Sequence, residues 1–159
     1  MAQEFDQDGN ATQVIYYGLS GERVLASAGY CEIQRVYNEN KQVKREAWFG
    51  TDGMPIHLQD TYCAIEREYD EYGNVCEQRF YDENGVLILN NAGYASERDT
   101  YRAAKEMIQA EYFGTDGERV LRKEGYAILK REMDDAGRVT GESYYGTDGA
   151  PILDRKSVV

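Results

Sequence analysis

The residue types that most often carry catalysis are few in this chain and stand in positions that other residues fill elsewhere. The only histidine is His57, and the residues 32 positions before and after it are both leucine. Cys31 and Cys63 share their position with alanine further along the chain, which indicates a site for a small side chain. A Cys-His nucleophile pair is therefore not expected. Zinc is not expected either, because one His and three scattered Cys lack the short paired spacing of structural zinc sites.

Acidic residues are abundant, but their placement favours turns over catalysis or calcium binding. The chain holds 29 Asp and Glu, and no acidic pair stands out among its near-equivalent segments, whereas a glycosidase site is a single pair of carboxylates. Asp52, Asp116 and Asp148 precede glycine in the sequence GTDG, which is typical of a tight turn. No window has the spacing of a calcium loop. We expect no catalytic residue, no metal site and no cofactor.

Aromatic side chains are the best candidates for a binding site. Of the 19 aromatic residues, 18 recur in four columns, each with a constant 32-residue spacing. Two of these columns are adjacent in sequence, so one ring of each pair should face the core and the other should be more exposed. Sugars stack on exposed rows of rings, and an aromatic wall also holds cations. The alternative is that neighbouring strands cover both columns.

We expect ligand binding by the column that lies nearer the middle of its strand. Its members are Tyr16, Trp48, Phe80, Tyr112 and Tyr144. The adjacent column contains Tyr17, Phe49, Tyr81, Phe113 and Tyr145.

These rings are positioned by a sequence repeat. The chain falls into successive units with this same period, the fifth of them truncated: 5–36, 37–68, 69–100, 101–132 and 133–159. Segments such as VKREAWF (43–49) and YCAIEREY (62–69) alternate and are rich in aromatic and β-branched residues, which predicts strands. GTDG and DENG, where Asp or Asn stands beside Gly, predict tight turns. Each unit is thus a pair of linked hairpins.

The predicted fold is all-β, with tandem 32-residue β-hairpin repeats that form a β-solenoid or an elongated antiparallel meander. Residues 102–113, RAAKEMIQAEYF, have a composition that favours helix. We nevertheless expect strand there, because the 32-residue spacing continues across the segment.

Charge and hydropathy exclude several classes of partner. The formal net charge is -11, which repels phosphate backbones and anionic membrane surfaces, so nucleic acid is not an expected partner. No apolar run approaches the roughly 20 residues that span a bilayer, so membrane insertion is not expected. Residues 1–10 are polar, unlike a signal peptide. We interpret residues 1–159 as a single repeat array taken from a larger protein.

The repeated pattern, a Gly-Tyr, then Tyr-Asp before a glycine, then YFGTDG, resembles the aromatic and glycine-rich tandem repeats of bacterial, especially clostridial, surface proteins. In style it is similar to choline-binding and cell-wall-binding repeats, and more distantly to YD repeats. The resemblance implies a solenoid of β-hairpins that holds choline or carbohydrate between aromatic rings without catalysis. Those repeats are shorter and richer in tryptophan, whereas Trp48 is the only tryptophan here.

The sequence therefore predicts a non-catalytic repeat module that binds a glycan or cell-wall polymer through aromatic ladders, located outside the cell or at the cell surface. The alternative is a protein-interaction scaffold, in which the acidic surface recruits a basic partner and exposed edge strands accept an added strand. A structural spacer without a ligand is the third hypothesis.

Overall fold

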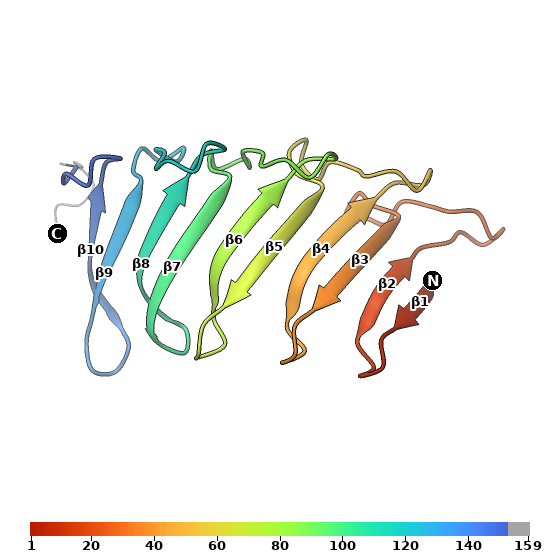
Figure 1. Cartoon of the computed structure of the whole chain (residues 1–159), viewed down its shortest axis with the longest axis horizontal. Coiled ribbons are helices and arrows are strands. Elements are labelled where there is room, and N and C mark those ends of the chain that lie inside the picture. Colours follow the sequence, from red (N-terminus) through yellow and green to blue (C-terminus); the bar gives the residue numbers. More distant parts are fainter. Residues whose placement is uncertain (153–159) are drawn as a thin grey trace. The chain divides into compact units, whose positions relative to one another are not determined.

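The computed structural model describes residues 1–152, and every regular element in that range is a β-strand (Figure 1). Neighbours in the chain are neighbours in a ten-stranded antiparallel sheet, which is an open meander. The prediction of an all-β antiparallel meander is confirmed. Leu153 and the rest of 153–159, assigned to the truncated fifth unit, lie outside the described residues. The strands are β1 (Ala2–Phe5), β2 (Ala11–Ile15), β3 (Glu32–Tyr37), β4 (Val43–Phe49), β5 (Ala64–Tyr69), β6 (Val75–Tyr81), β7 (Ser96–Ala103), β8 (Glu106–Phe113), β9 (Ile128–Met133) and β10 (Val139–Tyr145).

The chain divides into two compact units. Unit 1 contains Met1–Arg67 and Phe80–Leu87, and unit 2 contains Glu68–Arg79 and the described residues from Ile88 to Ile152. In both, the strands β3, β5, β7 and β9 begin at equivalent positions of successive sequence units. The described residues contain no helix that is long and apolar enough to cross a membrane.

Strand pairing in unit 1 places alternate residues on two different faces. Ile33 lies opposite Trp48, while Gln34 lies opposite Ala47, which in turn faces Ala64. We use inner face for the side that carries Trp48 and, in unit 2, Tyr112. The outer face is the opposite side, which carries the next residue in each strand. This alternation with period two is the pattern that the sequence showed in the segment 43–49.

The turns that close the strand pairs depend on a left-handed residue at one position. Gly73 and Gly137 have φ of 81° and 79° in the turns after β5 and β9. At the corresponding position the turns after β3 and β7 hold Lys41 and Lys105, with φ of 62° and 65°. The turn after β7 is only two residues long, so residues 102–113 are almost entirely strand, as predicted.

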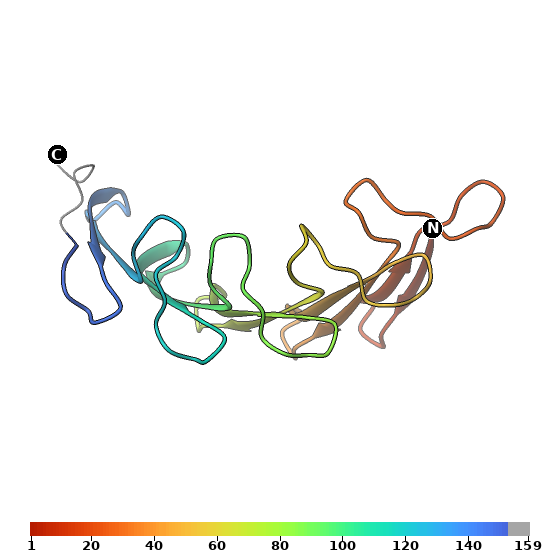
Figure 2. The ribbon, with the colours of Figure 1, turned by 90° about the horizontal axis from the view of Figure 1, so that it is seen from above.

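Longer loops connect the other ends of the strands and leave the sheet on both sides (Figure 2). In unit 2 the loops at 89–94 and 121–126 project on one side, and the loops at 114–119 and 146–151 project on the other. The first pair of loops ends in a Gly-Tyr whose ring packs on the inner face. The second pair contains the GTDG turns and borders the outer face. Each face is therefore flanked by its own set of loops.

Candidate functional site

The column predicted to bind ligand lies on the inner face and is the more covered of the two. Trp48 and Phe80 are each 6% exposed and Tyr112 is 2% exposed, while Tyr16 and Tyr144 are half-buried. Their rings pack against the tyrosines that close the Gly-Tyr loops. These residues have a structural role in the core of each unit, and ligand binding by them stays a prediction.

The ring contacts form a ladder within each unit. In unit 1, Tyr62 lies between Trp48 and Phe80, with ring centroids 5.8 and 5.0 Å apart. In unit 2, Tyr112 lies 4.7 Å from Tyr94 and 5.9 Å from Tyr126. Edge and tilted contacts at these distances are the favourable geometries for aromatic pairs. Burial raises the pKa of Tyr112 and of its neighbours, so their hydroxyls stay neutral.

Arg122 covers the ladder of unit 2 and was missed by the sequence analysis. Its guanidinium carbon lies 4.6 Å from the ring centroid of Tyr112, and 5.5 and 5.4 Å from those of Tyr94 and Tyr126. Glu124 accepts from its Nε and Nη2 at 2.6 and 3.1 Å. This cation closes the ladder from the loop side, so a ligand does not have free access to these three rings.

The adjacent column lies on the outer face and keeps more ring surface accessible. Tyr17 is 40% exposed, and the other four rings are half-buried. The expectation that one member of each pair faces the core and the other is more exposed is confirmed for the first four pairs, whereas Tyr144 and Tyr145 are both half-buried. Each residue of the adjacent column stands at the start of a loop that contains the glycine turn. Its backbone forms an isolated β-bridge with a residue just after that turn, as Phe113 does with Arg119.

Charged side chains accompany the rings of the outer face. The guanidinium carbon of Arg98 lies 4.7 Å from the ring centroid of Phe113, and Nζ of Lys130 lies 4.9 Å from that of Tyr145. In both cases the cation comes from the neighbouring strand, two positions along from the residue that faces the ring. Such diagonal neighbours are within reach across an antiparallel pair.

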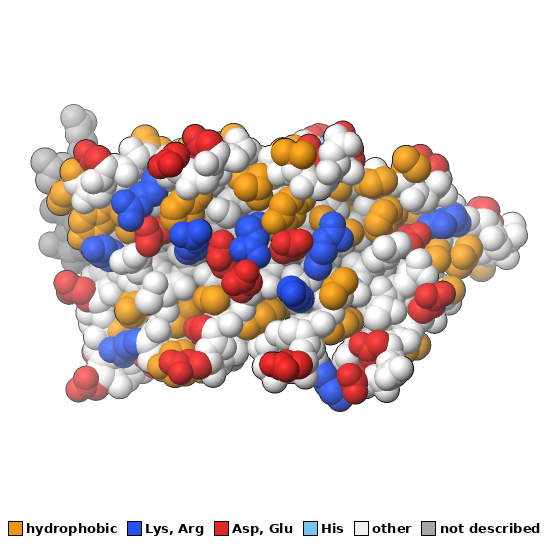
Figure 3. Space-filling view, viewed as in Figure 1, with side chains coloured by type: hydrophobic (Ala, Val, Ile, Leu, Met, Phe, Trp, Pro, Cys, Tyr) orange, Lys and Arg blue, Asp and Glu red, His pale blue; other side chains and the backbone are white. Residues whose placement is uncertain are grey.

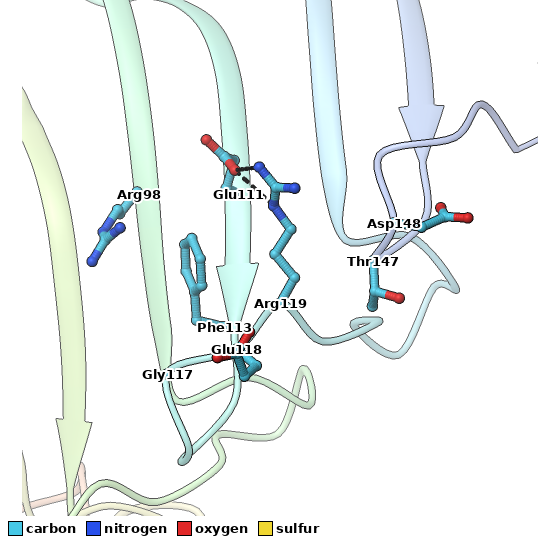
Figure 4. Close-up of a pocket in the computed structure, with 8 residues that line it drawn as sticks. All are labelled: Arg98, Glu111, Phe113, Gly117, Glu118, Arg119, Thr147 and Asp148. Atoms are coloured by element: carbon cyan, nitrogen blue, oxygen red, sulfur yellow. Dashed lines mark hydrogen bonds and ion pairs between the residues drawn. The ribbon is translucent and has the colours of Figure 1, made fainter.

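A groove of about 690 Å³ opens beside Phe113 in unit 2 (Figure 4). Its sides come from strands β7 and β8 and from the glycine turns of the fourth and fifth sequence units. The lining residues are Arg98, Glu111, Phe113, Gly117, Glu118, Arg119, Thr147 and Asp148. The groove thus offers one apolar ring surrounded by positively and negatively charged side chains that can form hydrogen bonds.

The polar groups of the groove are held by defined contacts. Arg119 donates from Nε and Nη2 to Oε2 of Glu111, at 3.0 and 2.7 Å, as drawn in Figure 4. Arg98 makes a looser ion pair of 3.5 Å with Glu77, and 61% of its side chain is exposed. Arg119 and Glu111 are therefore pre-oriented, whereas Arg98 remains accessible above the ring of Phe113.

Arg119 is a departure from the repeat. The residues at the matching positions 55, 87 and 151 are Pro, Leu and Pro, and Arg23 is the other arginine in this column. Arg23 forms an ion pair with Glu32 on the outer face of unit 1. A comparison of the copies position by position could have singled out these two arginines, because the other members of the column carry no charge.

The aspartates of the GTDG turns have the structural role that was predicted for them. Oδ1 of Asp52, Asp116 and Asp148 accepts the backbone N–H two residues further on, at 3.0, 3.0 and 2.9 Å. This is the hydrogen bond of an Asx-turn, which here spans the left-handed glycine that follows each aspartate. One oxygen of Asp148 is used in this way, at the rim of the groove.

Charge is mixed on the surface of the molecule. Figure 3 shows one face, on which basic and acidic side chains are interspersed and do not gather into a patch of one sign.

No protein-family model matches this chain, and no curated protein is detectably similar to it in sequence.

Proposed function

We propose that the chain is a non-catalytic repeat module that binds a neutral, hydroxyl-rich glycan or cell-wall polymer along its outer face. The observation that carries the proposal is the groove beside Phe113, where a partly exposed ring stands among Arg98, Glu111 and Arg119. A sugar ring presents an apolar face for stacking and hydroxyls for hydrogen bonds at its rim. The resemblance to bacterial surface repeats favours the same ligand class and a location at the cell surface.

The proposal shifts the main contact from the predicted column to the adjacent one. Trp48, Phe80 and Tyr112 are buried and support the sheet, while Tyr16 and Tyr144 keep part of their rings accessible. We further propose that the linked hairpins form a tandem array of the solenoid type. Equivalent outer-face rings would then act as several weak sites, and affinity would rise with the number that one polymer contacts.

A binding measurement with purified cell-wall polysaccharide tests the proposal. Replacing Phe113 with alanine removes the ring from the groove, and we expect a loss of affinity of about two- to twelvefold, since an aromatic contact contributes about 0.5–1.5 kcal/mol. Tyr72→Ala is the matched control, because Tyr72 is an exposed aromatic residue outside the four columns. Equal affinity of wild type and Phe113→Ala would refute the role of the groove.

The second candidate is a protein-interaction scaffold, which the net charge of -11 favours. A basic partner held mainly by charge would lose affinity steeply between low and high salt, because exposed charges are screened within about 10 Å at 0.1 M salt. Glycan stacking would change little over the same range. Absence of binding to either ligand class would favour the structural spacer.

A further inference from the structure

Three side chains that can bind a transition metal meet in unit 1, away from the groove and on none of the aromatic columns. They are His57, Cys63 and Glu83. One donor atom from each lies within 4.8 Å of the other two. Nε2 of His57 and Oε2 of Glu83 are only 2.7 Å apart. His57 and Glu83 are exposed and Cys63 is buried, so the cluster can be reached from solvent on one side.

The imidazole is oriented so that one nitrogen is available to a metal. Nδ1 of His57 lies 2.7 Å from the backbone oxygen of Thr61. A carbonyl oxygen only accepts hydrogen bonds, so Nδ1 carries a proton, and a second proton lies between Nε2 and the carboxylate of Glu83, where a metal can replace it. Metal-bound histidines are held by the same kind of bond from their other ring nitrogen. The turn that supplies this carbonyl is unusual, because Gln59 and Asp60 both have positive φ, 51° and 58°.

The other two donors are also held by local structure. The backbone N–H of Cys63 donates to the oxygen of Tyr81 at 2.8 Å, which ties it to the strand that ends just before Glu83. Glu83 follows Asp82, whose Oδ1 accepts the N–H of Val86 at 2.9 Å and fixes the turn. The loop with His57 and Cys63 and the turn with Glu83 are therefore held beside each other.

This combination of donors occurs once among the sequence units. In the neighbouring units, Leu25 and Leu89 stand at the position of His57, and Thr51 and Thr115 stand at the position of Glu83. Cys63 shares its column with Cys31, Ala95 and Ala127. The donors therefore do not follow from the repeat itself, because the hairpins of the other units form with apolar or neutral residues at these places.

We propose that His57, Cys63 and Glu83 form a three-ligand Zn²⁺ site whose fourth position is taken by water. Nitrogen, sulfur and carboxylate oxygen are the donors that zinc uses, with metal distances of about 2.0–2.3 Å. Tetrahedral geometry at those distances requires the Nε2 to Oε2 separation to open from 2.7 Å to about 3.3 Å. The metal replaces the proton between these two atoms, and the Cys63 thiol releases its proton to solvent.

Titration of the reduced, metal-free protein with Co²⁺ and then Zn²⁺ tests the site. Co²⁺ reports its ligands, since a thiolate gives a charge-transfer absorption and four-coordinate geometry gives intense visible bands. Three variants each install the residue of another copy and should therefore fold: His57→Leu, Cys63→Ala and Glu83→Thr. Cys31→Ala is the matched control, because Cys31 fills the same column but is accompanied by Leu25 and Thr51.

We expect one Co²⁺ per chain with a thiolate absorption, displacement by Zn²⁺, and at least tenfold weaker binding in each of the three variants. Cys63→Ala should also lose the thiolate absorption, while Cys31→Ala should keep it. Zinc should raise the melting temperature of the wild type but not of Glu83→Thr. The site is refuted if folded wild type gives no thiolate absorption, or if Cys63→Ala retains it.

Discussion

Replacement of Asp99 by asparagine should stabilise unit 2 at neutral and alkaline pH. Asp99 lies on the inner face of β7, opposite the fully buried Ala110. Its Oδ1 is buried and accepts no hydrogen bond from any residue that the structure describes. Burial, together with the negative charge of Glu97, raises the pKa of Asp99 to about 8, and Arg131 offsets only part of this effect. The native state therefore keeps a proton that the unfolded chain releases.

The sign of the pH dependence follows from this difference. The folded pKa is above the unfolded value of 3.8, so the native state binds more protons between about pH 4 and pH 8 and the free energy of unfolding falls as pH rises through that window. The upper limit is about 6 kcal/mol, from about 1.4 kcal/mol for each pH unit of difference. Because Asp99 is only part buried and solvent screens its charge, we expect about 2 kcal/mol.

Urea unfolding at pH 3, 6 and 9, followed by circular dichroism, measures the effect. Asp99→Asn should match the wild type at pH 3, below the unfolded pKa, and exceed it by about 2 kcal/mol at pH 9, which is about 1 M in the urea midpoint. The other carboxylates are common to both proteins and cancel in the difference. Asp135→Asn, at an exposed turn position, is the control and should show no such trend. A gain that is equal at all three pH values, or a carboxyl signal of Asp99 that titrates near pH 4 in NMR, would refute this reasoning.

Further predictions concern the turns and the inner ladder. Lys105→Gly should stabilise the fold by about 1 kcal/mol in urea unfolding, because a lysine at φ 65° is strained where glycine is not. Conversely, Gly9→Ala should cost about 1 kcal/mol through its φ of 83° alone, since no atom lies within 4 Å of an added Cβ. Tyr112→Ala should cost about 3–5 kcal/mol by opening a cavity between Tyr94 and Tyr126, whereas Tyr112→Phe should cost less than about 1 kcal/mol.

The strands and turns were predictable because their signals are local. Alternation in 43–49 and Asp-Gly in the GTDG turns each determine a conformation within a few residues, independent of distant contacts. The segment 102–113 shows the limit of composition, because Ala, Lys, Glu and Met favour helix, yet the segment forms strands β7 and β8 around a two-residue turn. Pairing with neighbouring strands outweighs an intrinsic preference of a few tenths of a kcal/mol per residue.

The exposure of the two aromatic columns could not be predicted from the pairs alone. Adjacent residues such as Trp48 and Phe49 must face opposite sides, but the sequence does not say which side the Gly-Tyr loops cover. That choice depends on where Tyr62 packs, which is a contact between different parts of the hairpin unit. Strand periodicity gives the alternation, and only the path of the loops gives the burial.

Departures from the repeat are the places where a single copy gains its own chemistry. Asp99 occupies a column in which the other members are Arg35, Arg67 and Arg131, and it is a part-buried carboxyl with a raised pKa. Arg122 stands where other copies have Ala, Leu and Asn, and it closes the ladder of unit 2. His57 likewise replaces leucine beside Cys63.

In a chain of near-equivalent copies the shared residues build the hairpins, so a site specific to one place must come from residues that the other copies lack. The cluster around His57 satisfies that condition, and so does the groove through Glu111, the partner of Arg119 that no other copy has. The stability cost at Asp99 is what such a departure produces when its charge finds too few partners.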